Sequence, residues 1–311
     1  MAKIWTIGEI LVEIMRPAVD MPLDVPATFR GPFPSGAPAN FADSTARLGG
    51  KSAIIGAVGD DAFGRMTLDR LKSDGVDTSY IGVSPLSTGC AFVSYKSDGS
   101  RTFIFHMGNA ASGDVTVPDD LSPEAGDVLH ICGCSVSASP AMGENIIKVL
   151  RTFVKAGCKV SFDPNVRPEL LRDDSSAAMI AEVIENTSYL LPGVGELLTI
   201  SGCASVEDAV EKMFRNPKLE VIALKDGSNG CRIFTRERIV THGIYEVEVL
   251  DATGAGDSFD ASFVLGMTEG KPLEVIAEEA SAAAALAVAG FGPMEGNVTA
   301  DAVKELIGRG K

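Results

Sequence analysis

Short apolar runs alternate with amphipathic helical patterns along most of this chain, and no other feature restricts the possible folds as strongly. The runs lie at residues 3–7, 52–58, 127–132, 158–163, 188–191 and 219–224. Between them, apolar side chains recur at helical spacing over residues 39–48, 63–71 and 142–153. Continuous apolar strands separated by helices are typical of a parallel sheet that is covered by helices on both faces. The sequence therefore predicts an α/β fold in which ligands bind at the carboxyl ends of the strands.

Two regions interrupt this alternation and predict a second, smaller sheet. Strand patterns at residues 90–96 and 101–106 flank Asp98-Gly99, which is a strong signal for a two-residue hairpin turn. Residues 16–34 are extended and rich in proline. A small sheet of this kind can serve as a lid over a ligand, as a dimer contact, or as both.

Length and charge narrow the range of functions. The chain has 311 residues, enough for one large α/β domain or two smaller ones. We expect a single domain, 1–311, with a lid formed by about residues 10–34 and 86–108. The formal net charge of −15 and the pI near 4.7 argue against a nucleic-acid or anionic-membrane surface. No run of about 18 apolar residues is present, and the opening residues resemble a strand rather than a signal peptide. These features favour a cytoplasmic protein.

The cysteines and histidines do not form a metal-binding pattern. Six cysteines are scattered mostly among apolar neighbours, which favours buried thiols. Cys132-Gly-Cys134 has no second pair of cysteines or histidines at the spacing of a zinc site. His130 lies in an apolar run and is expected to be a core histidine.

Two common nucleotide-binding motifs are excluded. Gly49-Gly-Lys-Ser52 resembles the end of a P-loop, but it precedes a predicted strand instead of following one. No Gly-x-Gly-x-x-Gly segment follows the first strand, which disfavours a dinucleotide-binding domain.

Near the C-terminus, the segment Asp251-Ala-Thr-Gly-Ala-Gly-Asp257 leads directly into an apolar helical pattern. Gly254, Ala255 and Gly256 let a ligand approach the backbone closely, and the first helical turn leaves N–H groups without intrahelical partners. Such a helix start favours anions. An acid at this position, Asp257, can accept a proton from an attacking hydroxyl group. The alternative is an acidic cap at a glycine-rich turn.

Three further polar segments begin predicted helices or follow predicted strands. Asn40 lies on the first turn of a helix that begins near Gly36, where its amide can bind hydroxyl groups; a plain helix start is the alternative. Arg167 comes shortly after a predicted strand and can hold a phosphate or a carboxylate. The third segment is a loop with room for a nucleotide, although a hairpin turn explains it equally well. It contains Lys225, Gly227 and Gly230.

Two of these segments, which lie more than two hundred residues apart, together resemble the signatures of one enzyme family. Gly36-Ala-Pro-Ala-Asn40, with Gly49 and Gly59 downstream, and the segment 251–257 have the order and spacing found in the ribokinase-like (phosphofructokinase-B) sugar kinases. The match covers nearly the whole chain. The resemblance implies a three-layer αβα sandwich with a mostly parallel central sheet and a small β-sheet lid. It also implies a homodimer formed through the lid sheet.

The resemblance assigns the chemical step to the glycine-rich turn. Asp257 would be the general base that takes the proton from a sugar hydroxyl as it attacks the γ-phosphate of ATP. The amides of Gly254, Ala255 and Gly256 would form an anion hole for the transferring phosphoryl group.

It also assigns residues to the sugar and to magnesium. Gly36 and Asn40, with Glu13 on the first strand, would bind sugar hydroxyls. Glu196 matches the acid of a family motif that organises Mg²⁺ and its waters, with Gly193 in place of the usual asparagine.

The nucleotide and a possible second cation complete the implied site. Gly227 and Gly230 would line the nucleotide. In family members that need potassium, Asp251 and Thr253 contribute to a monovalent-cation site beside the anion hole.

The identity of the sugar depends on the lid strand. Gly8-Glu9 on the first strand and the segment 163–167 resemble the branch of 2-keto-3-deoxygluconate kinases, fructokinases and tagatose kinases. In the ketodeoxygluconate enzymes an aromatic–arginine pair on the lid strand meets the carboxylate. Here the corresponding run, Phe103-Ile-Phe-His-Met-Gly108, lacks an arginine, and Arg101, earlier on the same strand, could compensate only if the register differs. We therefore expect a ketose or related sugar as substrate, with 2-keto-3-deoxygluconate as the alternative. A nucleoside kinase and a non-catalytic sugar or nucleotide sensor are further alternatives.

Overall fold

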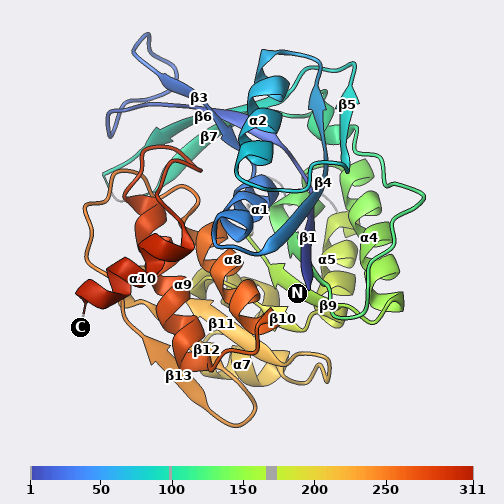
Figure 1. Ribbon diagram of the computed structural model, residues 1–311, viewed down its shortest axis with the longest axis vertical. Coiled ribbons are helices and arrows are strands. Elements are labelled where there is room, and N and C mark those ends of the chain that lie inside the picture. The colour runs from blue at the N-terminus through green and yellow to red at the C-terminus, as the bar shows by residue number, and fades with distance from the viewer. Residues whose placement is uncertain (1, 98–99, 166–173, 311) are drawn as a thin grey trace.

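A nine-stranded, mostly parallel sheet forms the centre of the molecule in the computed structural model, which describes residues 2–97, 100–165 and 174–310 (Figure 1). Strand β12 alone runs antiparallel to its neighbours; every other neighbouring pair in the described sheet is parallel. In spatial order the strands are β13 (Ile239–His242), β12 (Cys231–Phe234), β11 (Val221–Lys225), β10 (Tyr189–Leu190), β9 (Lys159–Asp163), β8 (Val128–Cys132), β1 (Lys3–Ile7), β4 (Lys51–Gly59) and β5 (Ile81–Ser84).

The six predicted apolar strands correspond to β1, β4, β8, β9, β10 and β11, with ends that differ by at most two residues. These strands are mostly apolar because both faces of the sheet are covered. Trp5 and Ile7 of β1 belong to the core on one face of the sheet, and Ile4 belongs to the core on the other. The predicted parallel sheet is therefore confirmed.

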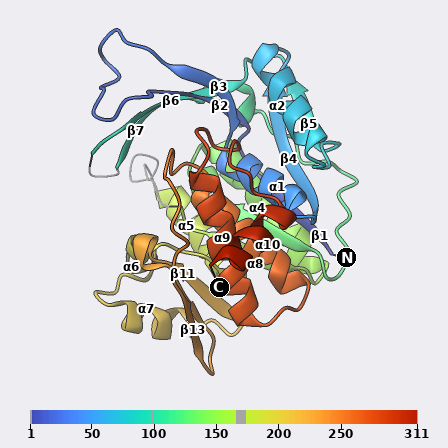
Figure 2. The ribbon, with the colours of Figure 1, turned by 60° about the vertical axis from the view of Figure 1, so that its left-hand side comes forward.

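Helices cover both faces of the sheet and make the three-layer αβα sandwich that was expected (Figures 1 and 2). Helices α4 to α7 contribute to the core on one face, and α1, α8, α9 and α10 contribute to the core on the other. The helices are α1 (Ala37–Arg47), α2 (Ala62–Ser73), α3 (Gly133–Val136), α4 (Pro140–Lys155), α5 (Asp174–Asn186), α6 (Val194–Ser201), α7 (Val206–Met213), α8 (Ala255–Thr268), α9 (Leu273–Val288) and α10 (Ala300–Arg309), with short 3₁₀ turns η1 (Ala111–Gly113) and η2 (Gly227–Asn229).

A second sheet of four strands projects from one end of this body (Figure 2). Its order is β3 (Arg30–Ser35), β2 (Leu11–Met15), β6 (Gly89–Tyr95) and β7 (Arg101–His106). The predicted hairpin turn at residues 98–99 lies outside the described residues. On either side of it, β6 and β7 pair antiparallel, and the Lys96 amide donates to the Ser100 carbonyl at 2.9 Å.

The start of the chain differs from the sequence prediction in one respect that matters for the site. Glu13 lies on β2 of the small sheet and not on the first strand, and Gly8 and Glu9 follow the end of β1. Gly8 has a φ of 156°, and a Cβ atom there would come within 2.6 Å of both Pro38 and Ser135. The chain leaves the main sheet at this glycine. The sequence does not show the break, because apolar residues resume directly after Glu9 and continue through residue 12.

Of two expectations about individual residue types, the one for the cysteines holds in part and the one for His130 holds. All six cysteines are thiols, although only Cys132 and Cys231 are fully buried. His130 is a core histidine that stacks on Phe41 at 3.8 Å and lies 3.1 Å from Oγ of Ser161. Burial lowers the pKa of its imidazole to about 3, so the ring is neutral. Within the described ranges, no helix is both long and apolar enough to cross a membrane.

Candidate active site

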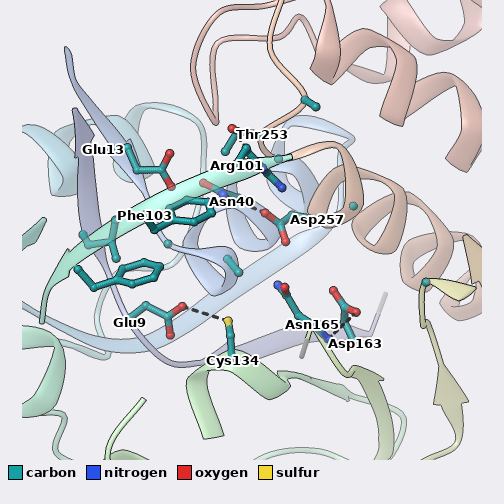
Figure 3. A pocket seen from close by; sticks show the side chains of 18 of the residues that line it. Glu9, Glu13, Asn40, Arg101, Phe103, Cys134, Asp163, Asn165, Thr253 and Asp257 are labelled. Carbon is teal, nitrogen blue, oxygen red and sulfur yellow. Dashed lines mark hydrogen bonds between the residues drawn. The ribbon is translucent and has the colours of Figure 1, made fainter. Parts of the chain in front are cut away.

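A polar cavity of about 410 Å³ lies where the carboxyl ends of the central strands meet the small sheet. Glu9 follows β1, Cys134 follows β8, Asp163 ends β9 and Lys225 ends β11, and all four residues line it. Figure 3 shows the first three of these side chains. The small sheet covers it with Arg101, Phe103 and Phe105 of β7 and with Leu11 and Glu13 of β2. The cavity therefore has the position that a parallel α/β sheet gives to a ligand.

The glycine-rich turn opens onto this cavity as the start of helix α8. Gly254 precedes the helix with a φ of 81°, and a Cβ atom there would lie 2.4 Å from the Pro293 carbonyl oxygen, so the position requires glycine. The turn has no side-chain cap, so amides of the first helical turn remain available to a ligand. Gly254 and Gly256 both line the cavity. This arrangement suits an anion.

Asp257 and Asn40 meet at this turn from opposite ends of the sequence. Asn40 Nδ2 donates a hydrogen bond of 2.9 Å to Asp257 Oδ2. Asn40 is only 4% exposed, and within the described residues its Oδ1 has no hydrogen-bond partner. Gly36 precedes α1 beside the cavity, with a φ of 113°. The position requires glycine because a Cβ atom there would come within 2.3 Å of the Glu9 carbonyl oxygen. A hydroxyl ligand at Asn40 would also lie near the carboxylate of Asp257.

Two buried carboxyl groups line the end of the cavity that the small sheet covers. Ser35 donates to Glu13 Oε1 at 2.8 Å, and Oε2 of Glu13 has no partner among the described residues. Burial raises the pKa of Glu13 to about 7. Glu9 accepts hydrogen bonds from Ser135 and from the Cys134 thiol, and burial raises its pKa as well. These carboxyl groups can bind hydroxyl groups, either as acceptors or, when protonated, as donors.

The lid strand β7 does bring an arginine to the site, contrary to the expectation from its sequence, because Arg101 lines the cavity. Arg101 lies on the same face of β7 as Phe103 and Phe105, since alternate residues of a strand share a face, and all three line the cavity. Figure 3 shows Arg101 and Phe103 on this strand. The Nη1 atom of Arg101 donates to Thr253 Oγ1 at 3.0 Å. The small sheet therefore supplies a cation that touches the glycine-rich turn.

Asp251 organises the other side of that turn. Its Oδ1 accepts from the amide of Thr253 at 2.9 Å and from its hydroxyl at 2.8 Å, and also from the Tyr95 hydroxyl at 2.8 Å. Its Oδ2 accepts from the Gly292 amide at 3.1 Å. Asp251 is 3% exposed, so this carboxylate holds the turn, the small sheet and the loop after α9 in one network.

Lys225 lies between two buried acids that the sequence analysis did not select. Its Nζ is 2.9 Å from an Asp260 oxygen and 3.3 Å from Asp163 Oδ1. Burial by itself would lower the pKa of Lys225, but the neighbouring carboxylates reverse this effect and leave the pKa raised. The lysine is therefore a permanent cation at the edge of the glycine-rich turn.

Glu196 also reaches this part of the cavity, from the first turn of α6. Its Oε2 accepts from the Gly193 amide at 2.7 Å, which fixes the carboxylate at the start of its own helix. Gly193 therefore positions Glu196 through its backbone, although it lacks the side chain of the expected asparagine.

A mostly apolar groove of about 740 Å³ adjoins the cavity and shares Lys225, Gly227, Ala252 and Gly256 with it. Ala284, Ala285 and Val288 of α9 and Phe259 of α8 line its walls. The small alanine side chains leave room for a flat ligand beside the helix. Gly230 also lines the groove. A Cβ atom there would lie 2.1 Å from the His242 carbonyl oxygen, so backbone packing alone explains why this residue is glycine.

Most of the residues singled out from the sequence thus meet at one place. The exception is Arg167, which lies outside the described residues. The sequence analysis did not select Glu9, Cys134, Asp163, Asn165 or Asp260 as site residues. Two of these carried a signal: Asp163 ends an apolar strand, and Asp260 follows Asp257 by one helical turn on the same face.

A carboxylate beside helix-start amides, a buried lysine and an apolar groove define a kinase for a small hydroxyl-bearing substrate. The family profile described as pfkB family carbohydrate kinase matches residues 1–300, and the chain belongs to this family. It is a phosphotransferase that acts on a sugar hydroxyl group.

Relatives agree with this assignment over most of the chain. A fructokinase from Klebsiella pneumoniae is 32% identical over 275 residues, which cover 85% of this chain and 84% of that protein. A fructokinase from Solanum tuberosum is 31% identical over 261 residues, which cover 82% and 78%. The crystal structure of a candidate ribokinase II from E. coli superimposes with a TM-score of 0.90 at 35% identity, covering 99% of this chain and all of the other. The same protein in complex with ATP and Mg²⁺ gives a TM-score of 0.89.

Proposed function

We propose that this kinase transfers the γ-phosphate of ATP to a hydroxyl group of a ketose or related sugar, with Asp257 as the general base. The observation that carries the proposal is the position of Asp257 in the first turn of α8, in contact with Asn40 and directly after the amides of Gly254, Ala255 and Gly256. One carboxylate is thereby next to both a hydroxyl-binding amide and an anion-binding turn.

The chemistry follows from this placement. Asp257 accepts the proton of the sugar hydroxyl as its oxygen bonds to the γ-phosphorus. The bond between the γ-phosphorus and the bridging oxygen breaks, and ADP leaves. The amides of Gly254, Ala255 and Gly256 stabilise the charge on the equatorial oxygens during transfer.

Lys225, Gly227 and Gly230 are the proposed nucleotide contacts, and Glu196 is the proposed magnesium residue. Mg²⁺ prefers oxygen ligands and commonly binds through one or two carboxylates, waters and substrate phosphates, which fits a single fixed carboxylate beside the phosphate end of the cavity. A Mg²⁺ ion held at Glu196 would neutralise phosphate charge and help to orient the γ-phosphate.

A monovalent cation beside Asp251 and Thr253 is a separate proposal. Both residues are buried next to Gly254, so a bound K⁺ would add positive charge beside the anion hole. Turnover should then rise with added KCl but not with added tetramethylammonium chloride. Equal turnover in the two salts would exclude the site.

The sugar end of the cavity favours a neutral ketose. Glu13 and Asn40 each direct a buried oxygen without a described partner toward hydroxyl groups, and Glu9 lies nearby. Glu13, whose pKa burial raises to about 7, can donate to or accept from an uncharged sugar hydroxyl, and its ionised form disfavours a carboxylate nearby. Arg101 is the observation that favours 2-keto-3-deoxygluconate as the second candidate, because guanidinium groups bind carboxylates well.

An ADP-release assay with Mg-ATP and a panel of ketohexoses, 2-keto-3-deoxygluconate, ribose and nucleosides tests the proposal. A ketohexose should give the highest kcat/KM, and Arg101→Met should retain that preference. If 2-keto-3-deoxygluconate gives the highest kcat/KM and Arg101→Met loses that substrate selectively, the second candidate replaces the first. The absence of ADP release with every compound would refute the kinase proposal.

We also propose that the small sheet, as a lid, closes over the sugar and forms a homodimer through its outer face. Phe92 on that face packs against Phe29 and His106, and Ile104 is 46% exposed. Apolar side chains on one face of a sheet are typical of an interface. Sedimentation should give a dimer for the wild type and a monomer for Ile104→Asp; a monomeric wild type would contradict this part of the proposal.

A further inference from the structure

Two arginines and two acids form a cluster behind the active site, between helices α1 and α2. Asp43, which is 1% exposed, lies 3.5 Å from Arg47 Nη1 and 3.9 Å from Arg70 Nε. Arg70 Nε also contacts Asp74 at 2.5 Å. None of these side chains lines the cavity or the groove described above. The cluster therefore has no direct contact with a substrate.

Both arginines donate to the backbone of the loop that follows α9. Arg47 Nη1 donates to the Met294 carbonyl at 3.0 Å, and Arg47 Nη2 donates to the Gly296 carbonyl at 2.8 Å. Arg70 Nη2 donates to the same Met294 carbonyl at 2.5 Å. Charged donors on neutral carbonyls make stronger hydrogen bonds than amides do. Three such bonds hold two carbonyls of one loop.

That loop contacts the glycine-rich turn at two points. The Gly292 amide donates to Asp251 Oδ2 at 3.1 Å. The Pro293 carbonyl packs so closely on Gly254 that a Cβ atom there would lie 2.4 Å from its oxygen. Any displacement of the loop therefore moves either the Asp251 carboxylate or the residue that starts α8.

We propose that Arg47 and Arg70 are positioning residues that hold the loop 291–296 against the glycine-rich turn, and so fix Gly254 and Asp251 for phosphoryl transfer. Helix α1 then acts at both of its ends. Asn40 in its first turn contacts Asp257, and Arg47 at its last residue holds the loop behind Gly254. Since this inference rests on the proposed kinase function, its test includes a measurement that does not depend on turnover.

The test compares Arg47→Met and Arg70→Met with Arg65→Met. Arg65 lies on α2 like Arg70, but its side chain is 64% exposed and pairs only with the exposed Asp60 among the described residues. Steady-state kinetics gives kcat and KM for sugar and ATP. Hydrogen–deuterium exchange reports on peptides that span residues 251–257 and 290–296.

A misplacement of catalytic groups by about 1 Å can cost about 10²-fold in rate. We expect kcat to fall by about 10- to 100-fold in Arg47→Met and Arg70→Met, with the KM for the sugar within about twofold of wild type. Exchange should accelerate in both peptides. Arg65→Met should resemble wild type in every measurement.

The double variant Asp43→Asn/Arg47→Met covers the case in which Arg47→Met fails to fold, because it also removes the buried acid that would lose the nearer of its two guanidinium partners. If a folded variant lacking the Arg47 guanidinium retains the wild-type kcat and the wild-type exchange of residues 251–257, the inference is wrong. If wild type phosphorylates no sugar, the proposed function fails, while the exchange measurement still decides whether Arg47 and Arg70 hold the turn.

Discussion

Asn40 Nδ2 donates a 2.9 Å hydrogen bond to Asp257 Oδ2, and this bond joins residues that are 217 positions apart in the sequence. It connects the first turn of α1 to the first turn of α8, two helices that pack side by side on one face of the main sheet. The bond fixes the carboxylate of Asp257 beside the glycine-rich turn, on the wall of the cavity. The two signature segments of the family thus meet at one pair of atoms.

Replacing Asp257 should remove the chemical step and preserve the fold. Asp257→Asn retains an oxygen that can accept from Asn40 but lacks a carboxylate to accept the proton, so kcat should fall by about 10²–10⁴-fold. ATP affinity, measured by calorimetry, should stay close to wild type. Asp60→Asn is the matched control, because the side chain of Asp60 is 81% exposed and lies outside the cavity. Turnover of Asp257→Asn near the wild-type value would contradict the general-base role.

Glu13 should make stability depend on pH. Its pKa is raised from 4.5 to about 7 by burial, so between these values the unfolded chain loses this proton before the folded chain does. The free energy of unfolding should therefore fall as pH rises from about 4.5 to about 7. One pKa unit corresponds to about 1.4 kcal/mol, so the loss from this group is roughly 3 kcal/mol.

Denaturant unfolding at pH 4.5 and pH 7.5 measures this effect by comparing wild type with Glu13→Gln, which cannot ionise. Other buried acids contribute equally to both proteins and cancel in the difference. A wild-type pH dependence identical to that of Glu13→Gln would show that the carboxyl of Glu13 is not perturbed.

Gly254 should tolerate no side chain. Alanine at a left-handed position costs about 1–2 kcal/mol, and at Gly254 it also meets the Pro293 carbonyl. Gly254→Ala should therefore lose both stability and turnover. Gly270 has a φ of 67° with open space around it, so Gly270→Ala should lose only the backbone part and keep wild-type kcat. Similar kcat values for the two variants would argue against close packing at the turn.

Lys225 should stabilise the fold as well as bind the nucleotide. Lys225→Met leaves Asp163 and Asp260 buried together without their cation, which should cost about 3–5 kcal/mol in denaturant unfolding. Adding Asp260→Asn should recover part of that loss but not the affinity for ATP. Lys271→Met is the control, because Lys271 pairs with Glu269 and Glu279 at a side-chain exposure of 34%, and its loss should cost under about 1 kcal/mol. Equal losses at the two lysines would contradict the buried network.

The main sheet and the glycine-rich helix start could be predicted from the sequence because both depend on local patterns. The run at residues 128–132 is mostly apolar because both faces of β8 are covered: Val128 belongs to the core on one face of the sheet, and Leu129 and Ile131 belong to the core on the other. Gly254 and Asp257 lie three residues apart, so their relation follows from helix geometry alone. The same local reasoning failed at Gly8, where a single backbone angle moves Glu13 from the main sheet to the small sheet.

Contacts between distant segments could not be predicted from one sequence where no family motif marks them. The two guanidinium bonds from Arg47 end 247 and 249 residues away, at carbonyl groups that carry no sequence signal. Whether Arg101 faces the cavity could not be decided from the sequence, because strand pairing, which is long-range, sets the register of β7. Asp163 and Asp260 belong to one ion-pair network only through Lys225, which lies between them in the fold.

The cavity and the apolar groove share four lining residues, so they form one continuous path from β7 to α9. A bisubstrate ligand, in which a sugar is joined through phosphates to adenosine, would fill both at once. Joining the two halves makes the second binding event intramolecular, which can strengthen binding by about 10²–10⁴-fold over either half alone. The number of phosphates that gives the tightest ligand would then measure, in solution, the separation between the sugar hydroxyl and the nucleotide.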